Sequence, residues 1–202
     1  MEDWQLEQES KPNIALAFHE AGHLVAAYRL GIPFTGREAV AILPSKGDAG
    51  VSIQRNIVCG ANLEPDVSDQ SRLKMERLVQ VCLGGIEAQR RQDPSSVRYG
   101  EEDFGDGDGG LDYGEAVELI GFFASGPKEP KAYLKLLRIR TEYLIAGRNW
   151  DCVEAVAEAL LQQKTLSAEE AINIIQATIS RRVRQPEARA REVLDQARAE
   201  GA

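Results

Sequence analysis

The clearest pattern along the chain is a helical one over residues 13–30. Apolar residues recur there every three or four positions, at Ile14, Ala17, Phe18, Ala21, Val25 and Tyr28. A proline precedes the stretch, and a glycine and a proline follow it. This spacing puts the apolar side chains on one face, and the flanking residues are typical helix boundaries. The sequence therefore predicts an amphipathic helix over residues 13–30.

Two short β-prone runs come next, at residues 38–44 and 50–58, separated by the turn-forming segment SKGDAG. Runs of this kind joined by a short polar segment favour a hairpin or a pair of strands. From residue 69 onward the pattern is helical, with predicted helices at 69–92, 111–125, 130–149, 150–163 and 167–183. The predicted fold is therefore mostly α with a small β-sheet, an α+β arrangement with a helical bundle at its C-terminal end.

Two details refine the helices. Gly84 and Gly85 lie inside the helix predicted at 69–92, and each glycine costs about 1 kcal/mol relative to alanine, so the pair indicates close approach of another backbone. Ser167 and Glu170 form the Ser-x-x-Glu pattern of a helix N-terminal capping box.

We divide the chain into an N-terminal extension (1–12), one main domain (13–185) and a charged C-terminal tail or helix (186–202).

The composition of the chain excludes several classes of protein. The 202 residues carry a net charge of −8, which argues against nucleic-acid binding, because that rests on neutralising phosphates with Lys and Arg. No apolar run approaches the roughly 20 residues of a membrane span, and the acidic start is unlike a signal peptide. A cytoplasmic location is expected. Three widely spaced cysteines indicate buried thiols rather than a disulfide framework.

The only two histidines of the chain, His19 and His23, lie in the first predicted helix within HEAGH. Side chains at positions i and i+4 share one face, so both rings can point a nitrogen at one metal ion. Zinc accepts imidazole ligands, and Glu20 lies beside them, where a general base can take a proton from the attacking water. A chance match on a solvated helix is the alternative, but the motif uses the whole histidine supply. The pattern therefore predicts a zinc site.

A catalytic zinc needs a third protein ligand. A metzincin would have glycine and histidine where Ala26 and Arg29 stand, so that class is excluded. Glu38 follows a Gly and Pro break at the edge of a predicted strand, which disfavours the thermolysin arrangement. The third ligand must then be a carboxylate or a thiolate, and the acidic loop before LDYGEA supplies several carboxylates.

The sequence resembles the peptidase domain of the FtsH family, the membrane-anchored AAA proteases. The resemblance lies in HEAGH at 19–23, LGGIEAQ at 83–89 and GGLDYGEA at 109–116, and it covers most of residues 13–180. It implies Asp112 as the third zinc ligand, beside His19 and His23. Asp106, Asp108 and Glu115 lie close in sequence and remain alternatives.

The resemblance implies a zinc metallopeptidase with Glu20 as its catalytic base, cleaving peptides or unfolded protein segments. Because no apolar run is long enough to span a membrane, and the family is membrane-anchored, this chain is expected to depart from the family in being soluble. The chain contains no Walker P-loop, so its activity is expected to be independent of ATP, and a separate AAA ATPase partner stays open. The family assembles as rings, which leaves a homo-oligomer open as well. Gly50, Val51 and Ser52 are expected to bind an extended substrate at a strand edge. The alternative function is a non-catalytic, metal-binding regulatory or adaptor module on the same scaffold.

Overall fold

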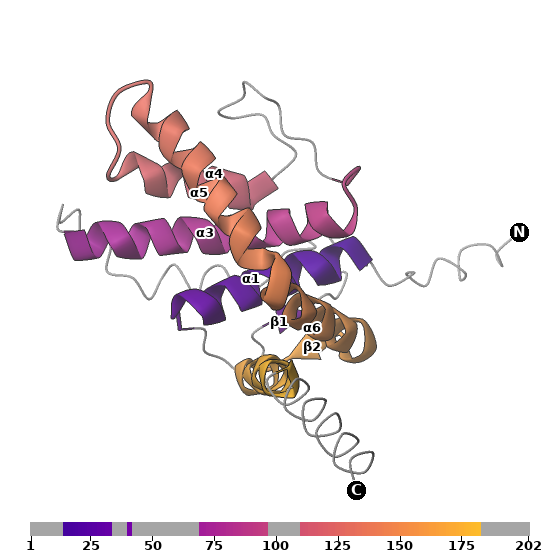
Figure 1. The fold of residues 1–202 in the computed structure, drawn as a ribbon. Coiled ribbons are helices and arrows are strands. Elements are labelled where there is room, and N and C mark those ends of the chain that lie inside the picture. The colour runs from indigo at the N-terminus through magenta and orange to yellow at the C-terminus, as the bar shows by residue number, and fades with distance from the viewer. Residues whose placement is uncertain (1–13, 34–39, 42–68, 97–109, 183–202) are drawn as a thin grey trace, which may run out of the picture.

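A computed structural model describes residues 14–33, 40–41, 69–96 and 110–182 of the protein (Figure 1). This part is mostly helical, as the sequence predicts. Its elements are α1 (Ile14–Leu30), β1 (Val40–Ala41), α3 (Asp69–Gln92), α4 (Gly110–Gly121), α5 (Glu129–Ile145), the 3-10 turn η1 (Gly147–Asn149), α6 (Trp150–Gln163) and β2 (Thr165–Leu166). Residues 168–182 form a further helix.

The centre of the fold is the contact between α1 and α3, which pack along each other while α5 crosses in front of both (Figure 1). Small residues make this contact close: a Cβ added to Gly84 would lie 2.9 Å from the carbonyl oxygen of Gly22 and 2.8 Å from the Cβ of Ala26. The close backbone approach predicted from the Gly84–Gly85 pair is confirmed. Only glycine allows the two helices to come this near.

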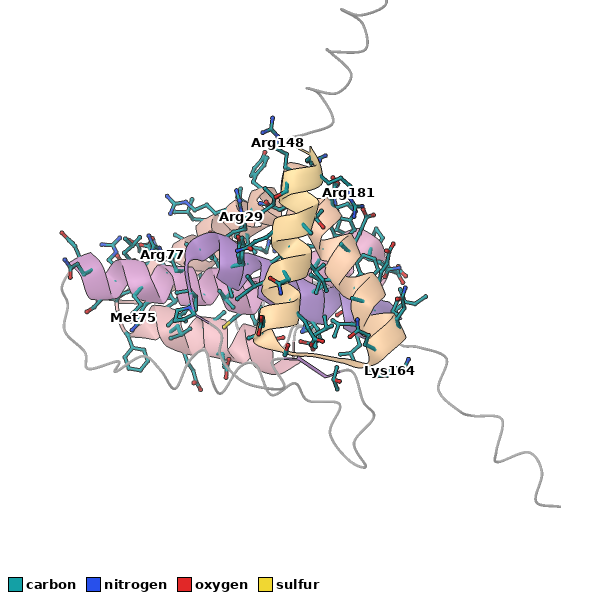
Figure 2. All side chains as sticks on the ribbon, turned by 90° about the horizontal axis from the view of Figure 1, so that it is seen from below. Arg29, Met75, Arg77, Arg148, Lys164 and Arg181 are labelled. Carbon is teal, nitrogen blue, oxygen red and sulfur yellow. The ribbon has the colours of Figure 1, made fainter. Side chains whose placement is uncertain are left out.

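The other helices cover this pair. α4 and α5 pack on α3, and α6 packs on α1. The helix over residues 168–182 lies beside α6, with Lys164 at the turn between them (Figure 2), and Arg182 pairs with Asp151 at 2.6 Å. Cys82 and Cys152 are buried free thiols, as expected, whereas Cys59 lies outside the described residues.

The helix boundaries agree closely with the sequence pattern. α3 and α6 occupy the predicted ranges, and the predicted capping box is confirmed: the Glu170 N–H donates to the Ser167 hydroxyl at 3.2 Å, and the Ser167 N–H donates to the Glu170 carboxylate at 2.8 Å. Two helices end earlier than predicted. α4 stops at Gly121, where the next two N–H groups bond three residues back instead of four, and α5 stops before Ala146, whose backbone is extended.

The small sheet involves an unexpected strand. β1 pairs antiparallel with β2, so that Val40 lies opposite Leu166 and Ala41 opposite Thr165. The sequence pattern predicts no strand at residues 165–166, because two residues are too few to show an alternating pattern. Residues 50–58 lie outside the described part of the chain, so the predicted hairpin between 38–44 and 50–58 stays a prediction.

Among the helices that the structure describes, none combines the length and the apolar character needed to cross a membrane. The predicted extension at 1–12 and the tail at 186–202 lie outside the described ranges.

Candidate metal centre

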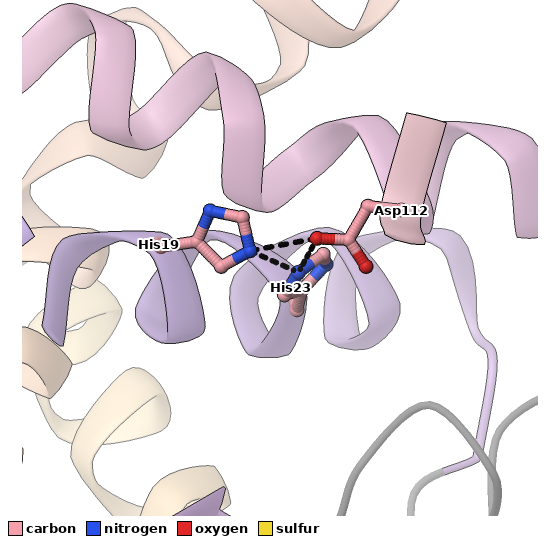
Figure 3. Close-up of side chains that lie close together, drawn as sticks. All are labelled: His19, His23 and Asp112. Atoms are coloured by element: carbon pink, nitrogen blue, oxygen red, sulfur yellow. Dashed lines mark hydrogen bonds and ion pairs between the residues drawn. The ribbon is translucent and has the colours of Figure 1, made fainter. Parts of the chain in front are cut away.

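Three side chains from two helices converge on one point (Figure 3). His19 and His23 reach it from successive turns of α1, and Asp112 reaches it from the first turn of α4. The Nε2 atom of His19 lies 2.7 Å from Asp112 Oδ2, the Nε2 atom of His23 lies 3.2 Å from the same oxygen, and the two Nε2 atoms are 3.1 Å apart. The three residues form a group that could hold a metal ion.

His23 is fixed by the backbone of α3. Its Nδ1 donates to the carbonyl oxygen of Val81 at 2.7 Å, and its ring lies against Gly85, where an added Cβ would be 2.7 Å from the ring Cε1. Val81 and Gly85 are one helical turn apart, so the ring occupies the space that the missing side chain leaves. Donation through Nδ1 leaves Nε2 as the nitrogen that can bind a metal.

His19 is oriented by a side chain rather than by the backbone. Its Nδ1 donates to the Oε1 atom of Gln89 on α3 at 3.1 Å. The side chain of His19 is 17% exposed, compared with 2% for His23, so this histidine lies on the more open side of the site. A second interaction of this kind, from Nδ1 to a hydrogen-bond acceptor, is typical of histidines that bind metals.

These contacts bring three electron-rich atoms together. With both Nδ1 atoms donating, the two Nε2 lone pairs and the Asp112 carboxylate face one another at 2.7–3.2 Å. Such atoms repel unless a proton or a cation lies between them. Ligands placed at about 2.0–2.1 Å from a tetrahedral zinc ion are about 3.3 Å apart, which is close to two of the observed distances, 3.1 and 3.2 Å, and longer than the third, 2.7 Å. The donor set and its dimensions are therefore compatible with a metal ion, zinc among the possible ones.

The pKa values of His23 and Asp112 also indicate that the site favours a positive charge beside the Asp112 carboxylate. Burial alone would lower the pKa of His23, but its charge interaction and hydrogen bond with Asp112 outweigh this and raise the pKa to about 9. Burial would raise the pKa of Asp112, yet the two histidines hold it well below its usual range. The first turn of α4 adds to this, because a helix N-terminus stabilises a carboxylate.

Glu20 lies beside this group without belonging to it. Its side chain is buried, and its Oε2 atom has no hydrogen-bond partner within the part of the chain that the structure describes; the same is true of Asp112 Oδ1. Burial raises the pKa of Glu20 to about 8, against the lowering effect of His23. Glu20 is therefore a buried carboxyl group whose charge interacts with both His23 and Asp112 of the candidate metal site.

Of the other carboxylates considered as third ligand, the structure describes only Glu115. Glu115 points to Cys82, with 3.8 Å between its Oε2 and the thiol sulfur, and it is not part of the converging group. Asp106, Asp108 and Glu38 lie outside the described residues, as do the predicted substrate-binding residues Gly50, Val51 and Ser52.

Three contributors to the site were not identified from the sequence: the carbonyl of Val81, the space at Gly85 and the amide of Gln89. The glycine pair indicated a close approach but not that a histidine ring would occupy it. Val81 and Gln89 carry no sequence signal, because their role depends only on how α3 packs against α1.

Comparison with known proteins adds no family to these observations. No family model matches the chain, and a search of curated proteins found no match.

Proposed function

We propose that this protein is a zinc-dependent endopeptidase of the FtsH-like type that hydrolyses peptides or unfolded protein segments. The observation that carries the proposal is the convergence of His19 Nε2, His23 Nε2 and Asp112 Oδ2, with a buried Glu20 beside them. Two imidazoles and one carboxylate leave a fourth position open, which is the arrangement of a catalytic zinc rather than a structural one.

Zinc held by these three residues would polarise the scissile carbonyl and lower the pKa of water towards about 7. Glu20 would take a proton from the attacking water as the new carbon–oxygen bond forms. It would then give that proton to the amide nitrogen as the carbon–nitrogen bond breaks, which regenerates the carboxylate. Burial raises the pKa of Glu20 to about 8 in the metal-free protein, and a bound zinc ion would lower that pKa, which favours the carboxylate that accepts the proton.

The resemblance of HEAGH, LGGIEAQ and GGLDYGEA to the FtsH peptidase domain supports the same assignment. In this proposal the chain cleaves segments that are already extended, and a separate AAA ATPase is the partner that would unfold larger substrates. This part of the proposal rests on the resemblance alone.

The test of the chemistry is Glu20→Gln, with zinc content and hydrolysis of an unstructured fluorogenic peptide measured on the same preparation. We expect unchanged zinc content and a loss of kcat of about 10²-fold or more, because the base is removed and the ligands are kept. Glu118→Gln is the matched control, since Glu118 is exposed on α4 and lies outside the metal-ligand group. Undiminished hydrolysis by zinc-loaded Glu20→Gln protein would contradict the mechanism.

The test of the ligand set is Asp112→Ala, analysed for zinc by elemental analysis. We expect near-complete loss of zinc, because two imidazoles on one helix hold it far less tightly than three ligands do. If the wild-type protein retains zinc but hydrolyses none of a broad peptide library, the non-catalytic module becomes the better assignment.

A further inference from the structure

The outward side of α5 carries an apolar stripe that the core does not use. Leu136 is 43% exposed, Ile139 is 40% exposed and Tyr143 is 77% exposed, and Ala132 is exposed as well. These four residues follow one another at intervals of four, three and four positions. That spacing forms a seam along one side of a helix and is the spacing of the a and d positions in paired helices. We call these four residues the α5 seam.

The seam is distinct from the face of α5 that packs into the protein. The core-facing residues of this helix are Leu134, Leu137, Thr141 and Ile145. α5 crosses in front of α1 and α3 in Figure 1, with its outer side towards the viewer. Large apolar side chains that line up on the outside of a helix, instead of being scattered, indicate a surface that is covered by another helix.

The charged residues beside the seam indicate which helix this is. Lys135 and Glu142 are exposed and border the same side of the seam, seven positions apart. If a second copy of α5 packs antiparallel, Lys135 of each copy lies opposite Glu142 of the other, so two opposite-charge pairs form at once. If the copies pack parallel, Lys135 faces Arg140 and like charges meet. The flank is therefore self-complementary in the antiparallel arrangement only.

We propose that the α5 seam is a self-association surface on which two copies of this chain pair through antiparallel α5 helices. A helix of 17 residues is about 25 Å long, and four seam residues per copy form a contact smaller than the roughly 1,200–2,000 Å² of a standard interface. The dimer is therefore weak and depends on concentration. This inference is independent of the peptidase assignment, since it uses no residue of the metal centre.

The first test is sedimentation equilibrium of the whole protein from about 10 μM to about 1 mM, a range that covers weak association. The wild type is expected to shift from monomer towards dimer across this range. Leu136→Glu is expected to abolish the shift, because it places a charge in the middle of the seam. Leu73→Glu is the matched control: Leu73 is similarly exposed, at 49%, but lies on α3, so this variant is expected to dimerise like the wild type.

The second test separates the antiparallel arrangement from other modes of contact. Lys135→Glu and Glu142→Lys should each weaken dimerisation by about ten-fold, because each places like charges opposite one another twice. An equimolar mixture of the two variants should dimerise again, since every pair in the mixed dimer has opposite charges. The double variant should also dimerise. Circular dichroism of each variant checks the monomer, because Glu142 also lies 3.4 Å from Arg90 within the chain.

Three results would overturn the inference. A wild type that stays monomeric to about 1 mM would show that the seam does not pair two copies of this chain. A dimer that survives Leu136→Glu, or that shows no recovery when the two charge variants are mixed, would place the contact elsewhere or in another orientation.

Discussion

The two sides of the candidate metal centre are built differently, although their histidines are one turn apart on the same helix. On the inner side, His23 is buried, its Nδ1 donates to a backbone carbonyl of α3, and its ring fills the space above Gly85. On the outer side, His19 is partly exposed and its Nδ1 donates to the side chain of Gln89. One ligand is held by the backbone and by close packing, and the other by a single replaceable side chain.

Because of this difference, the two histidines should respond differently to substitution. A backbone carbonyl cannot be removed by substitution, so the inner ligand depends on how closely α1 and α3 pack. The outer ligand depends on the chemistry of one amide, which a single substitution can delete or convert to a carboxylate. We therefore expect changes at the inner side to act on folding and on metal binding together, and changes at the outer side to act on metal binding alone.

The largest expected effect is on stability, and it comes from Gly22, which lies in the close contact between α1 and α3. In Gly22→Ala the new Cβ would collide with the Gly84 carbonyl and lie 2.6 Å from the Cβ of Ala88, so α1 and α3 must move apart. We expect a loss of about 3 kcal/mol in the free energy of unfolding, measured with urea. Gly114→Ala is the control, because Gly114 is exposed on α4 with nothing within 4 Å of its added Cβ. That control should gain about 0.5–1 kcal/mol, and equal destabilisation of both variants would refute the close-packing argument.

Gly85→Ala tests the inner ligand directly. Its Cβ would lie 2.7–2.8 Å from ring carbons of His23, so the ring must turn away from Val81 and from the metal position. We expect zinc affinity to fall by more than about 100-fold, at the upper end of what the loss of a supporting contact costs, measured by competition with a chelating dye. A variant that folds and binds zinc like the wild type would show that the position of His23 does not depend on Gly85.

The same contrast explains what the sequence could and could not predict. The α1 helix, and the placement of His19 and His23 on one of its faces, follow from a local pattern, and the sequence predicted both. The glycine pair in α3 predicted close approach, because its cost within a helix is a local signal. Asp112 was reached through a family resemblance, since no local rule says which carboxylate of the Gly-rich loop meets the histidines. Gln89 and the pairing of β1 with β2 were missed, because both depend on packing between distant segments.

The pH dependence of zinc binding should reflect the inner ligand. Zinc and a proton compete for His23 Nε2, and the contacts with Asp112 raise the pKa of His23 to about 9. The protonated form therefore predominates below that pH, and zinc affinity should rise by about ten-fold per pH unit from about pH 7 to about pH 9, then level off. Calorimetry in two buffers of different ionisation enthalpy should detect about one proton released per zinc bound near pH 7. Affinity that is constant across this range would show that His23 is already neutral.

The smallest effect is expected at the outer ligand. Gln89→Ala leaves the Nδ1–H of His19 without its acceptor, so the ring is free to rotate, and zinc affinity should fall by about ten-fold with no change in urea stability. Gln89→Glu should restore the affinity or exceed it, because a carboxylate accepts the same hydrogen bond more strongly and makes the ring a better donor to the metal. Gln80→Ala on the same helix is the control, since within the described part of the chain that amide bonds only to the Glu76 carbonyl, at 3.3 Å. If alanine and glutamate at position 89 bind zinc equally, Gln89 does not orient His19. The outer side of the site would then resemble the inner one, with its ligand fixed by packing rather than by a replaceable side chain.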